Sequence, residues 1–353
     1  MILKEILKES WESKGKSVFF NSWEEADFKE LENEFRAFFN GELLKKKRLG
    51  KIHENATKIT PIDQNFDDNN FNFEKIACDE ILFGFKHDPQ MSCETNFMKE
   101  NFKQFDHFAI VNKSPICKYH SLIVPFLHDK LPQKMDSDAL AAVLRIMDFF
   151  QSSSKTLRIG FNSLGGYSSI NHLHFHLVFV NELFHETKAF PIESAPNKLM
   201  ASFNLQIPFQ DKQNLQIDIY IIEEYPIRCL MIKTIDEINE ESLINLMGDT
   251  VAIILSLLCE ENIAHNMMIA EKGKVFYIIP RQNEAVNERK MDFNCAWLEL
   301  CGLAICKNEE IFSKINYQDY YQFLRENIGY DELFFERWMQ KINNYFKDYC
   351  GLI

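Results

Sequence analysis

The chain has 353 residues, of which 46% are hydrophobic and 26% are charged, a balance typical of a globular protein with one large core or two modest ones. Its formal net charge of −13 at pH 7 argues against binding of nucleic acid through a generally basic surface. The nine cysteines are scattered without a C-x-x-C pair, which argues against a cysteine zinc knuckle and favours a reduced, cytoplasmic protein.

The N-terminal residues are charged throughout and lack the apolar core of a signal peptide. Residues 1 to about 40 are predicted to be helical, because their apolar residues keep helical spacing from the start. The basic run at residues 45–48 is expected to be a solvated face, and the Asn- and Asp-rich residues 53–72 a surface loop. No apolar run approaches membrane-spanning length, since residues 251–259 are too few, so we expect no membrane segment.

The next part of the chain predicts an antiparallel sheet with one helix across it. Strands are expected at residues 81–85, 107–112 and 120–125, from Arg158 onward, and over residues 172–180. A helix capped by Asp136 or Ser137 is expected between the third and fourth strands, because Leu140, Val143, Leu144, Met147 and Phe150 recur at helical spacing. This order of elements is typical of an α+β layer.

The second half of the chain repeats this order loosely. A strand is expected at residues 225–233, a helix at 240–260 and a hairpin formed by residues 267–270 and 275–279. The tail from Asn283 onward is predicted to be mostly helical. We therefore expect an internal duplication whose second copy lacks a histidine row.

The most informative stretch covers residues 160–180. His172, His174 and His176 alternate with apolar residues, so a strand here would place three imidazoles on one face and an apolar row on the other. A turn containing Gly165 and Gly166 precedes the histidines. Glycines allow backbone N–H groups to surround a small anion, so the stretch points to chemistry on a phosphate.

Three interpretations of the histidine row compete. The row could be a metal site, a histidine nucleophile with supporting groups, or a structural polar seam. The glycine turn and Ser169 favour the nucleophile, because a metal site does not need an anion-binding turn. No Asp, Glu or Cys nearby offers a further ligand, and the thiols of Cys295, Cys301 and Cys306 lie in an apolar segment, so no metal is expected.

The sequence from His172 to His176 resembles the signature of the histidine triad superfamily of nucleotide hydrolases and transferases. Residues 161–165, which lie before 170–175, and residues 170–175 themselves are similar to those of the GDP-hexose phosphorylases, which comprise GDP-D-glucose and GDP-L-galactose phosphorylases. Further similar stretches lie at residues 71–75, 114–116 with His120 and Pro125, 131–133, 225–228 and 262–266. The resemblance covers roughly residues 42–345.

The resemblance implies an α+β fold of histidine-triad-like antiparallel sheets with helices, in two related halves of which only the first carries the triad. We expect an N-terminal segment at residues 1–60, a catalytic half at 61–205, and a second half with a helical tail at 206–353. The oligomeric state remains open.

The resemblance also implies an activity, the transfer of GMP from GDP-glucose to inorganic phosphate through a guanylyl-histidine intermediate, without a cofactor or a metal. His174 is then the nucleophile, with His172 and His176 beside it. The nucleotide and its phosphates are expected to contact Asn162, Gly165, Gly166, Ser169 and His120. The expected partners are a GDP-sugar and phosphate, with neither nucleic acid nor membrane.

Two positions depart from the family pattern. His176 stands where these phosphorylases usually carry Gln, and Tyr119 stands where they usually carry Gly. An imidazole at the third position could activate water, so a nucleotide hydrolase that releases GMP from a GDP-sugar or a dinucleotide is one alternative function. A catalytically impaired nucleotide-binding paralogue is another.

Overall fold

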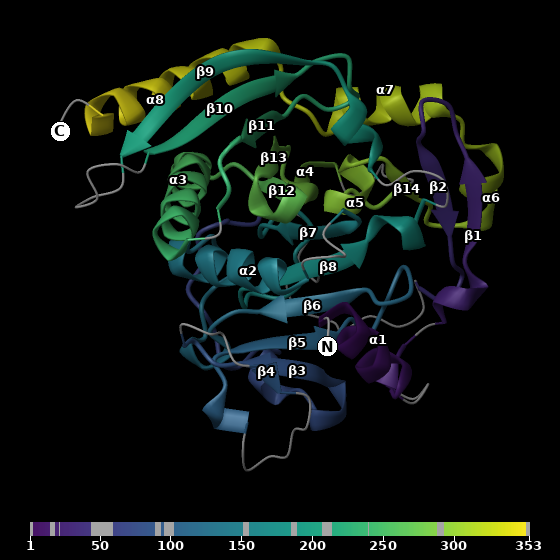
Figure 1. The fold of residues 1–353 in the computed structure, drawn as a ribbon. Helices are drawn as coiled ribbons and strands as arrows, with labels where there is room; N and C mark the ends of the chain where they lie inside the picture. Colours follow the sequence, from purple (N-terminus) through teal and green to yellow (C-terminus); the bar gives the residue numbers. More distant parts are fainter. Residues whose placement is uncertain are drawn as a thin grey trace.

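The computed structural model of the protein describes residues 3–14, 18–20, 22–43, 59–88, 93–94, 102–150, 155–184, 189–206, 214–238, 240–287 and 293–350. Within these ranges, eleven strands form one antiparallel sheet and three strands form a smaller one. The large sheet runs through the whole molecule, from β4 and β3 at one end to β9 at the other (Figure 1).

The first half of the large sheet belongs to the central part of the chain. Its elements are β3 (Ile81–Phe85), β4 (Cys93–Glu94), β5 (His107–Val111), β6 (Ser121–Val124), α2 (Ser137–Phe149), β7 (Leu157–Asn162) and β8 (Phe175–Phe179). The strands lie side by side in the order β4-β3-β5-β6-β8-β7. α2 begins as predicted, because the Asp136 side chain accepts a hydrogen bond of 2.9 Å from the Ala139 N–H.

The second half repeats this arrangement in reverse across the sheet. Its elements are β9 (Asn197–Gln206), β10 (Asn214–Ile222), β11 (Leu230–Lys233), α3 (Glu241–Glu260), β12 (His265–Ala270) and β13 (Val275–Pro280). The strand order continues as β12-β13-β11-β10-β9, and the halves join where β7 pairs with β12. Each half therefore contains the chain order strand, strand, helix, strand, strand, as β5, β6, α2, β7 and β8 in the first and as β10, β11, α3, β12 and β13 in the second, which confirms the predicted α+β fold with two related halves.

The two faces of the sheet have different partners. The larger hydrophobic cluster packs one face against α1 (Leu3–Glu12), α2, α3 and α8 (Glu332–Cys350), and it includes Leu173, Phe175, Leu177 and Phe179. A second cluster packs the opposite face of the second half against the small sheet and the tail helices. The apolar parity of the histidine stretch thus faces the core, as its alternation predicts, which turns the histidine parity toward the other face.

The N-terminal residues are less helical than predicted. Among the described residues of this segment α1 is the one α-helix, and it is followed by β1 (Asp27–Glu30) and β2 (Arg36–Phe39), which pair antiparallel. β2 also pairs in parallel with β14 (Leu303–Ile305), so these strands join the second half of the chain in the small sheet. The spacing of apolar residues near the N-terminus could not predict the pairing of β2 with β14, because β14 lies far along the sequence. The basic run at residues 45–48 lies outside the described residues.

The tail is helical, as predicted, apart from β14. Its helices are α4 (Glu284–Asn287), α5 (Trp297–Leu300), α6 (Glu309–Lys314), α7 (Tyr317–Asn327) and α8. α8 lies along β9 and β10 at the far end of the sheet (Figure 1). The predicted boundary at residues 205/206 falls inside β9, at its last residue, and β9 pairs antiparallel with β10 along its length.

α3 corrects one expectation from the sequence. In the described part of the chain it is the one helix long and apolar enough to span a membrane by length and composition, but 56% of it is buried inside the protein. It packs against α2 and supplies eight of its ten buried residues to the larger core. The apolar run looked too short because Gly248, Asp249 and Thr250 interrupt it, although the helix continues through them.

Candidate active site

A cavity of about 220 Å³ lies on the histidine face of the first half. The first half lines it with His120, Asn162, Ser169, His174 and His176, among others. The second half contributes Asn294 and the residues from Ala296 to Glu299, and the N-terminal part contributes Phe20 and Leu43. The chain therefore builds one cavity from three remote segments.

The histidine stretch is extended, but β8 itself begins only at Phe175. His176 pairs with Leu122 of β6 and Gly160 of β7, whereas His172 and His174 precede the strand. The segment before β8 is held by hydrogen bonds, since the Leu173 N–H donates to the Leu131 carbonyl at 2.8 Å. Two of the three imidazoles, His174 and His176, line the cavity.

His174 has the geometry of a nitrogen nucleophile. Its Nδ1 lies 2.8 Å from the backbone carbonyl of His172, an acceptor, so Nδ1 carries the proton and donates it. The lone pair is then on Nε2, the ring nitrogen farther from the backbone. Burial lowers the pKa of His174 to about 4, against the opposing effect of the His172 carbonyl, so the ring is neutral near pH 7.

The backbone of His174 is fixed by a buried glutamine. The Gln133 side chain accepts the His174 N–H through Oε1 at 2.9 Å and donates Nε2–H to the carbonyls of Asn162 at 2.8 Å and His174 at 3.2 Å. Gln133 is fully buried. It thereby links the end of β7 to the start of β8 and sets the position of the His174 ring.

His172 supports the row and does not line the cavity. Its Nδ1 accepts the Phe73 N–H at 3.1 Å, and its ring packs against Phe66 and Phe73 with centroids 5.2 and 5.5 Å apart. The ring is fully buried, and burial lowers its pKa to about 4, with nearby His174 adding to the shift. His172 therefore contributes its carbonyl to His174 and its ring to packing.

His120 and His176 form a contact beside the nucleophile. His120 Nε2 lies 3.0 Å from His176 Nδ1, and His120 Nδ1 accepts the Ile116 N–H at 3.2 Å. The ring centroids of His174 and His176 are 5.6 Å apart. Burial lowers the pKa of His120 to about 3 and lowers that of His176 well below its ordinary value, so both rings are neutral near pH 7.

Asn162 joins the halves and faces the cavity. Its Oδ1 accepts the Asn266 Nδ2–H at 2.6 Å and the Trp297 N–H at 3.0 Å, so the oxygen is held by two donors from the second half. Because these contacts fix the orientation of the amide, its Nδ2 is the group that Asn162 can offer to a ligand in the cavity.

The glycine turn differs from the expectation. Gly165 and Gly166 are not among the residues that line the cavity, and the Gly166 N–H donates to the Ser163 carbonyl at 3.0 Å. A Cβ on Gly166 would contact the His265 carbonyl, so this glycine allows the turn to approach the second half. The residues of the turn that reach the cavity are 167–170, including Ser169.

Two cations lie near the cavity. Lys113 lines the cavity and pairs with Glu80 at 3.2 Å. Arg281 is fully buried in the second half, with its guanidinium carbon 5.1 Å from the centroid of the Tyr167 ring. Both place positive charge near the cavity in a chain whose net charge is strongly negative, which favours an anionic ligand there.

Tyr119 shows how the chain accommodates a departure from the family pattern. Its φ is 64°, in the left-handed region that favours glycine. The ring contacts Trp11 of α1 at 6.3 Å between centroids, and its hydroxyl donates to Glu12 at 2.8 Å. Contacts with α1 thus offset the strain of the turn that places His120.

The metal interpretation gains no support from the described residues, among which no group of three or more His, Cys, Asp or Glu side chains is placed to hold a metal ion. The polar-seam interpretation describes His172 but does not describe His174 and His176, which line a cavity. Three supporting residues were not predicted from chemistry: Gln133, Asn266 and Trp297. Gln133 and Asn266 occur in stretches similar to the phosphorylases, which is the one signal the sequence held for them.

Several proteins of known activity are similar to this chain in sequence. The chain is 27% identical over 281 residues to GDP-L-galactose phosphorylase 2 of Arabidopsis thaliana, which covers 76% of this chain and 60% of that protein. It is 28% identical to GDP-D-glucose phosphorylase 1 of Danio rerio over 74% of this chain and 68% of that protein. Over a shorter region, 40% of this chain and 32% of the relative, it is 35% identical to GDP-D-glucose phosphorylase 1 of Homo sapiens.

The fold is also similar to that of a solved structure. Yeast Ap4A phosphorylase Apa2 in complex with Ap4A superimposes with a TM-score of 0.56 at 12% sequence identity, over 92% of this chain and 96% of that chain. At this identity the likeness shows the fold alone.

Family models cover almost the whole chain. The model described as GDPGP1-like, N-terminal domain, matches residues 2–178, and the model described as GDPGP1-like, C-terminal domain, matches residues 191–348. The sequence resemblance to GDP-hexose phosphorylases is thereby confirmed, and the chain belongs to the GDPGP1-like family.

Proposed function

We propose that the protein is a cytoplasmic GDP-hexose phosphorylase that transfers GMP from a GDP-hexose, with GDP-D-glucose as the expected substrate, to inorganic phosphate. The observation that carries this proposal is His174, a neutral imidazole whose Nδ1–H is held by the His172 carbonyl and which lines the cavity. The similarity to GDP-D-glucose and GDP-L-galactose phosphorylases supports the substrate class. This chain spans about 60% of the length of the plant relative, so the activity is proposed for it.

The first step is attack of the His174 Nε2 lone pair on the α-phosphorus. The bond between that phosphorus and the bridging oxygen breaks, and hexose 1-phosphate leaves with the electron pair. Because the second pKa of a phosphate monoester is about 6, the leaving group departs as an anion and needs a hydrogen-bond donor more than a strong acid.

In the second step inorganic phosphate is the nucleophile and His174 is the leaving group. An oxygen of inorganic phosphate attacks the guanylyl phosphorus, the P–N bond breaks, and GDP leaves as His174 regains its neutral form. Two successive displacements at one phosphorus give ping-pong kinetics.

The phosphate oxygens need donors during both steps. In our proposal Asn162 Nδ2 and the Ser169 hydroxyl supply them, with Lys113 adding charge, because all three residues line the cavity beside His174. The glycines at 165 and 166 shape the turn that carries Ser169.

One observation favours a second activity at the same site. His176 is an imidazole at the cavity wall, and an imidazole with a free lone pair could activate water to release GMP. We therefore expect phosphorolysis as the main reaction and a measurable hydrolytic side reaction.

The test is incubation with GDP-glucose with and without phosphate, followed by chromatography of the nucleotides. GDP as the main product with phosphate supports the proposal, whereas GMP alone under both conditions rules out the transferase. A panel of GDP-, UDP- and ADP-sugars, with GDP-L-galactose included, then identifies the base and the hexose. Binding of GDP without turnover of any sugar nucleotide would instead favour a regulatory protein.

A further inference from the structure

We infer that His120 is a positioning residue that fixes the tautomer of His176, so that His176 presents Nε2–H to the cavity and acts as a hydrogen-bond donor, not as a base. The catalytic consequence rests on the proposed function. The tautomer itself is a property of the free protein and can be tested without a substrate.

The inference starts from a backbone amide whose direction is fixed. The Ile116 N–H points at His120 Nδ1 over 3.2 Å, so Nδ1 must be the acceptor. A neutral imidazole has one N–H, which then belongs to Nε2. His120 Nε2 lies 3.0 Å from His176 Nδ1, and its proton is donated there.

The same rule, that a neutral imidazole has one N–H, determines the tautomer of His176. Because its Nδ1 accepts from His120, its single proton is on Nε2. Both rings are neutral near pH 7, since burial lowers both pKa values. The chain of donors therefore runs from the Ile116 amide through His120 to His176 and ends in the cavity.

The Asn112 side chain is a second potential hydrogen-bond donor to the His120 ring. Its Nδ2 lies 3.1 Å from His120 Nε2, and its Oδ1 accepts the Ser114 N–H at 3.0 Å. Two donors, Ile116 N–H and Asn112 Nδ2–H, thus face opposite nitrogens of one neutral ring, which can accept at only one of them. The backbone amide of Ile116 cannot be redirected, whereas the Asn112 side chain can turn at the loss of its hydrogen bond from the Ser114 N–H, so we assign the acceptor to Nδ1.

The tautomer of His176 affects whether inorganic phosphate or water attacks the guanylyl phosphorus in the second step. A His176 ring with Nε2–H can donate to the departing phosphate oxygen. In this tautomer it takes no proton from water, because its lone pair on Nδ1 is engaged by His120, so hydrolysis is confined to the minor fraction of His176 rings in the other tautomer. His176 then behaves like a carboxamide N–H, and the relay suppresses hydrolysis of the guanylyl intermediate.

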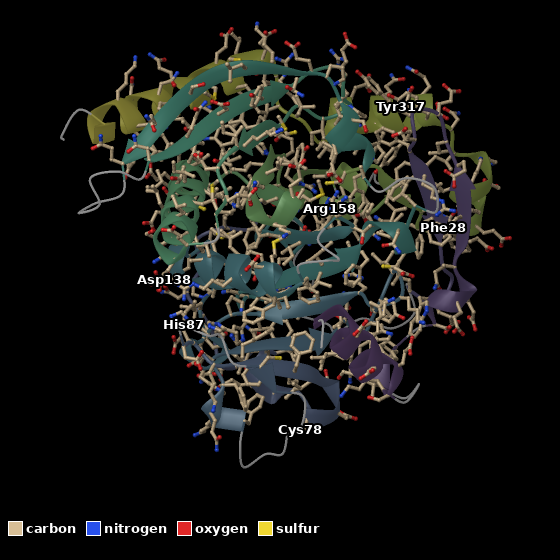
Figure 2. The ribbon with its side chains drawn as sticks, viewed as in Figure 1. Phe28, Cys78, His87, Asp138, Arg158 and Tyr317 are labelled. Atoms are coloured by element: carbon tan, nitrogen blue, oxygen red, sulfur yellow. The ribbon has the colours of Figure 1, made fainter. Side chains whose placement is uncertain are left out.

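The chain offers a matched control. His107 Nδ1 accepts the Phe126 N–H at 3.1 Å, and its Nε2 lies 3.1 Å from His87 Nδ1. This pair repeats the contacts of His120 and His176 but is not among the residues that line the cavity, and His87 lies toward the outer end of the first half (Figure 2). Replacing His107 therefore removes an equivalent contact, between a buried histidine and the exposed His87, without touching the site.

The direct test is an NMR measurement of the side-chain nitrogens of the free protein labelled with ¹⁵N-histidine, with His176→Gln used to assign the signals. We expect His176 to carry its proton on Nε2 and His120 to carry its proton on Nε2. A proton on His176 Nδ1 would overturn the inference whatever the substrate proves to be.

The kinetic test uses the ratio of GMP to GDP formed from GDP-glucose in the presence of phosphate. His120→Leu should raise this ratio about tenfold or more, because His176 can then adopt the tautomer that activates water. His120→Gln, which has both a donor and an acceptor, should return the ratio toward the wild-type value. His107→Leu should leave the ratio unchanged although it removes a buried histidine with similar contacts.

The last experiment combines His120→Leu with His176→Gln, because the double variant has no His176 imidazole whose tautomer His120 could fix. There we expect the ratio to change by less than about twofold. An equal change in both backgrounds, or no change in the wild-type background, would show that His120 serves packing alone. Absence of any phosphorolysis would contradict the proposed function, and the NMR result would still decide the tautomer.

Discussion

The two halves of the molecule build the same order of strands around one helix, yet they use the resulting sheet differently. In the first half, β8 turns His176 toward a cavity, whereas the corresponding β13 is buried along its whole length. On β13, Val275, Tyr277 and Ile279 pack into the second cluster beneath the tail. The first half thus leaves part of one sheet face uncovered, and the second half covers the equivalent face.

The covering elements are also what complete the site. α5 belongs to the tail that packs on the second half, and its Trp297 reaches across to line the cavity. The Trp297 N–H orients Asn162, as does Asn266 of β12. The comparison teaches that one copy of the duplicated unit keeps the reacting groups while the other holds them in place.

The largest expected effect comes from removing the reacting group of the first half. His174→Ala should lower kcat by at least about 10³-fold, because the covalent route is lost. Affinity for GDP, measured by calorimetry, should stay close to that of the wild type, since the wall from the second half is intact. Retention of most of the activity would show that His174 is not the nucleophile.

A second variant disturbs the contact between the halves without touching a titratable group. A Cβ on Gly160 of β7 would overlap the Trp297 indole, so Gly160→Ala should lower the free energy of unfolding by about 1–3 kcal/mol through overpacking. Thermal unfolding measures this effect. Gly41→Ala is the control, because its Cβ would meet only the Phe39 ring at 3.8 Å and should be nearly neutral.

Asn266→Ala tests how far the second half holds Asn162 in place. The variant removes hydrogen bonds to Asn162 Oδ1 and, at 2.7 Å, to the Gly166 carbonyl, leaving buried acceptors, and should cost about 1–3 kcal/mol of stability. Because Asn162 can then turn, KM for the sugar nucleotide should rise more than kcat falls. Asn204→Ala, on the exposed face of β9, should change neither value, and an equal loss from both variants would contradict this account.

The smallest expected effect is that of pH on activity near neutrality. Burial lowers the pKa values of His174 to about 4 and of His120 to about 3, so kcat/KM should change little between pH 8 and pH 6 on account of these rings. A steep fall centred near 6.5, the ordinary value for histidine, would show that the rings titrate as if exposed.

Stability should respond to pH more than activity does. The unfolded chain takes up protons on these histidines near pH 6.5, whereas the folded chain takes them up only near pH 4 for His172 and His174. The lowered pKa values therefore favour the folded state fully above pH 6.5, and this stabilisation is lost as the pH falls toward 4. Urea unfolding at pH 7.5 and 5 measures the loss.

Much of this arrangement could be predicted from the sequence. The period of two over residues 172–180 correctly placed Leu173, Phe175 and Leu177 against the core, because an amphipathic strand has only one way to bury its apolar row. Asp136 marked the start of α2, and the repeated order of elements indicated the duplication. These signals are local, so one sequence is enough to detect them.

The features that were missed depend on partners remote in the chain. β9 alternates weakly and is mostly exposed, so only its pairing with β10 makes it a strand. Gln133 fixes the backbone of His174 because it donates to the carbonyls of Asn162 and His174. The residues next to Gln133 in the sequence give no indication of these two partners. The glycine turn was assigned to anion binding because glycine permits both a nest of amides and a close approach between segments, and here Gly166 serves the approach.

The most direct measurement of the central claim is mass spectrometry of the protein after incubation with GDP-glucose in the absence of phosphate. The account predicts a GMP adduct on the peptide that contains His174, labile to acid as a phosphoramidate is, and discharged to GDP when phosphate is added. His174→Ala should carry no adduct. Turnover of GDP-glucose with no adduct on the wild-type protein, or with an adduct on a different residue, would contradict the account.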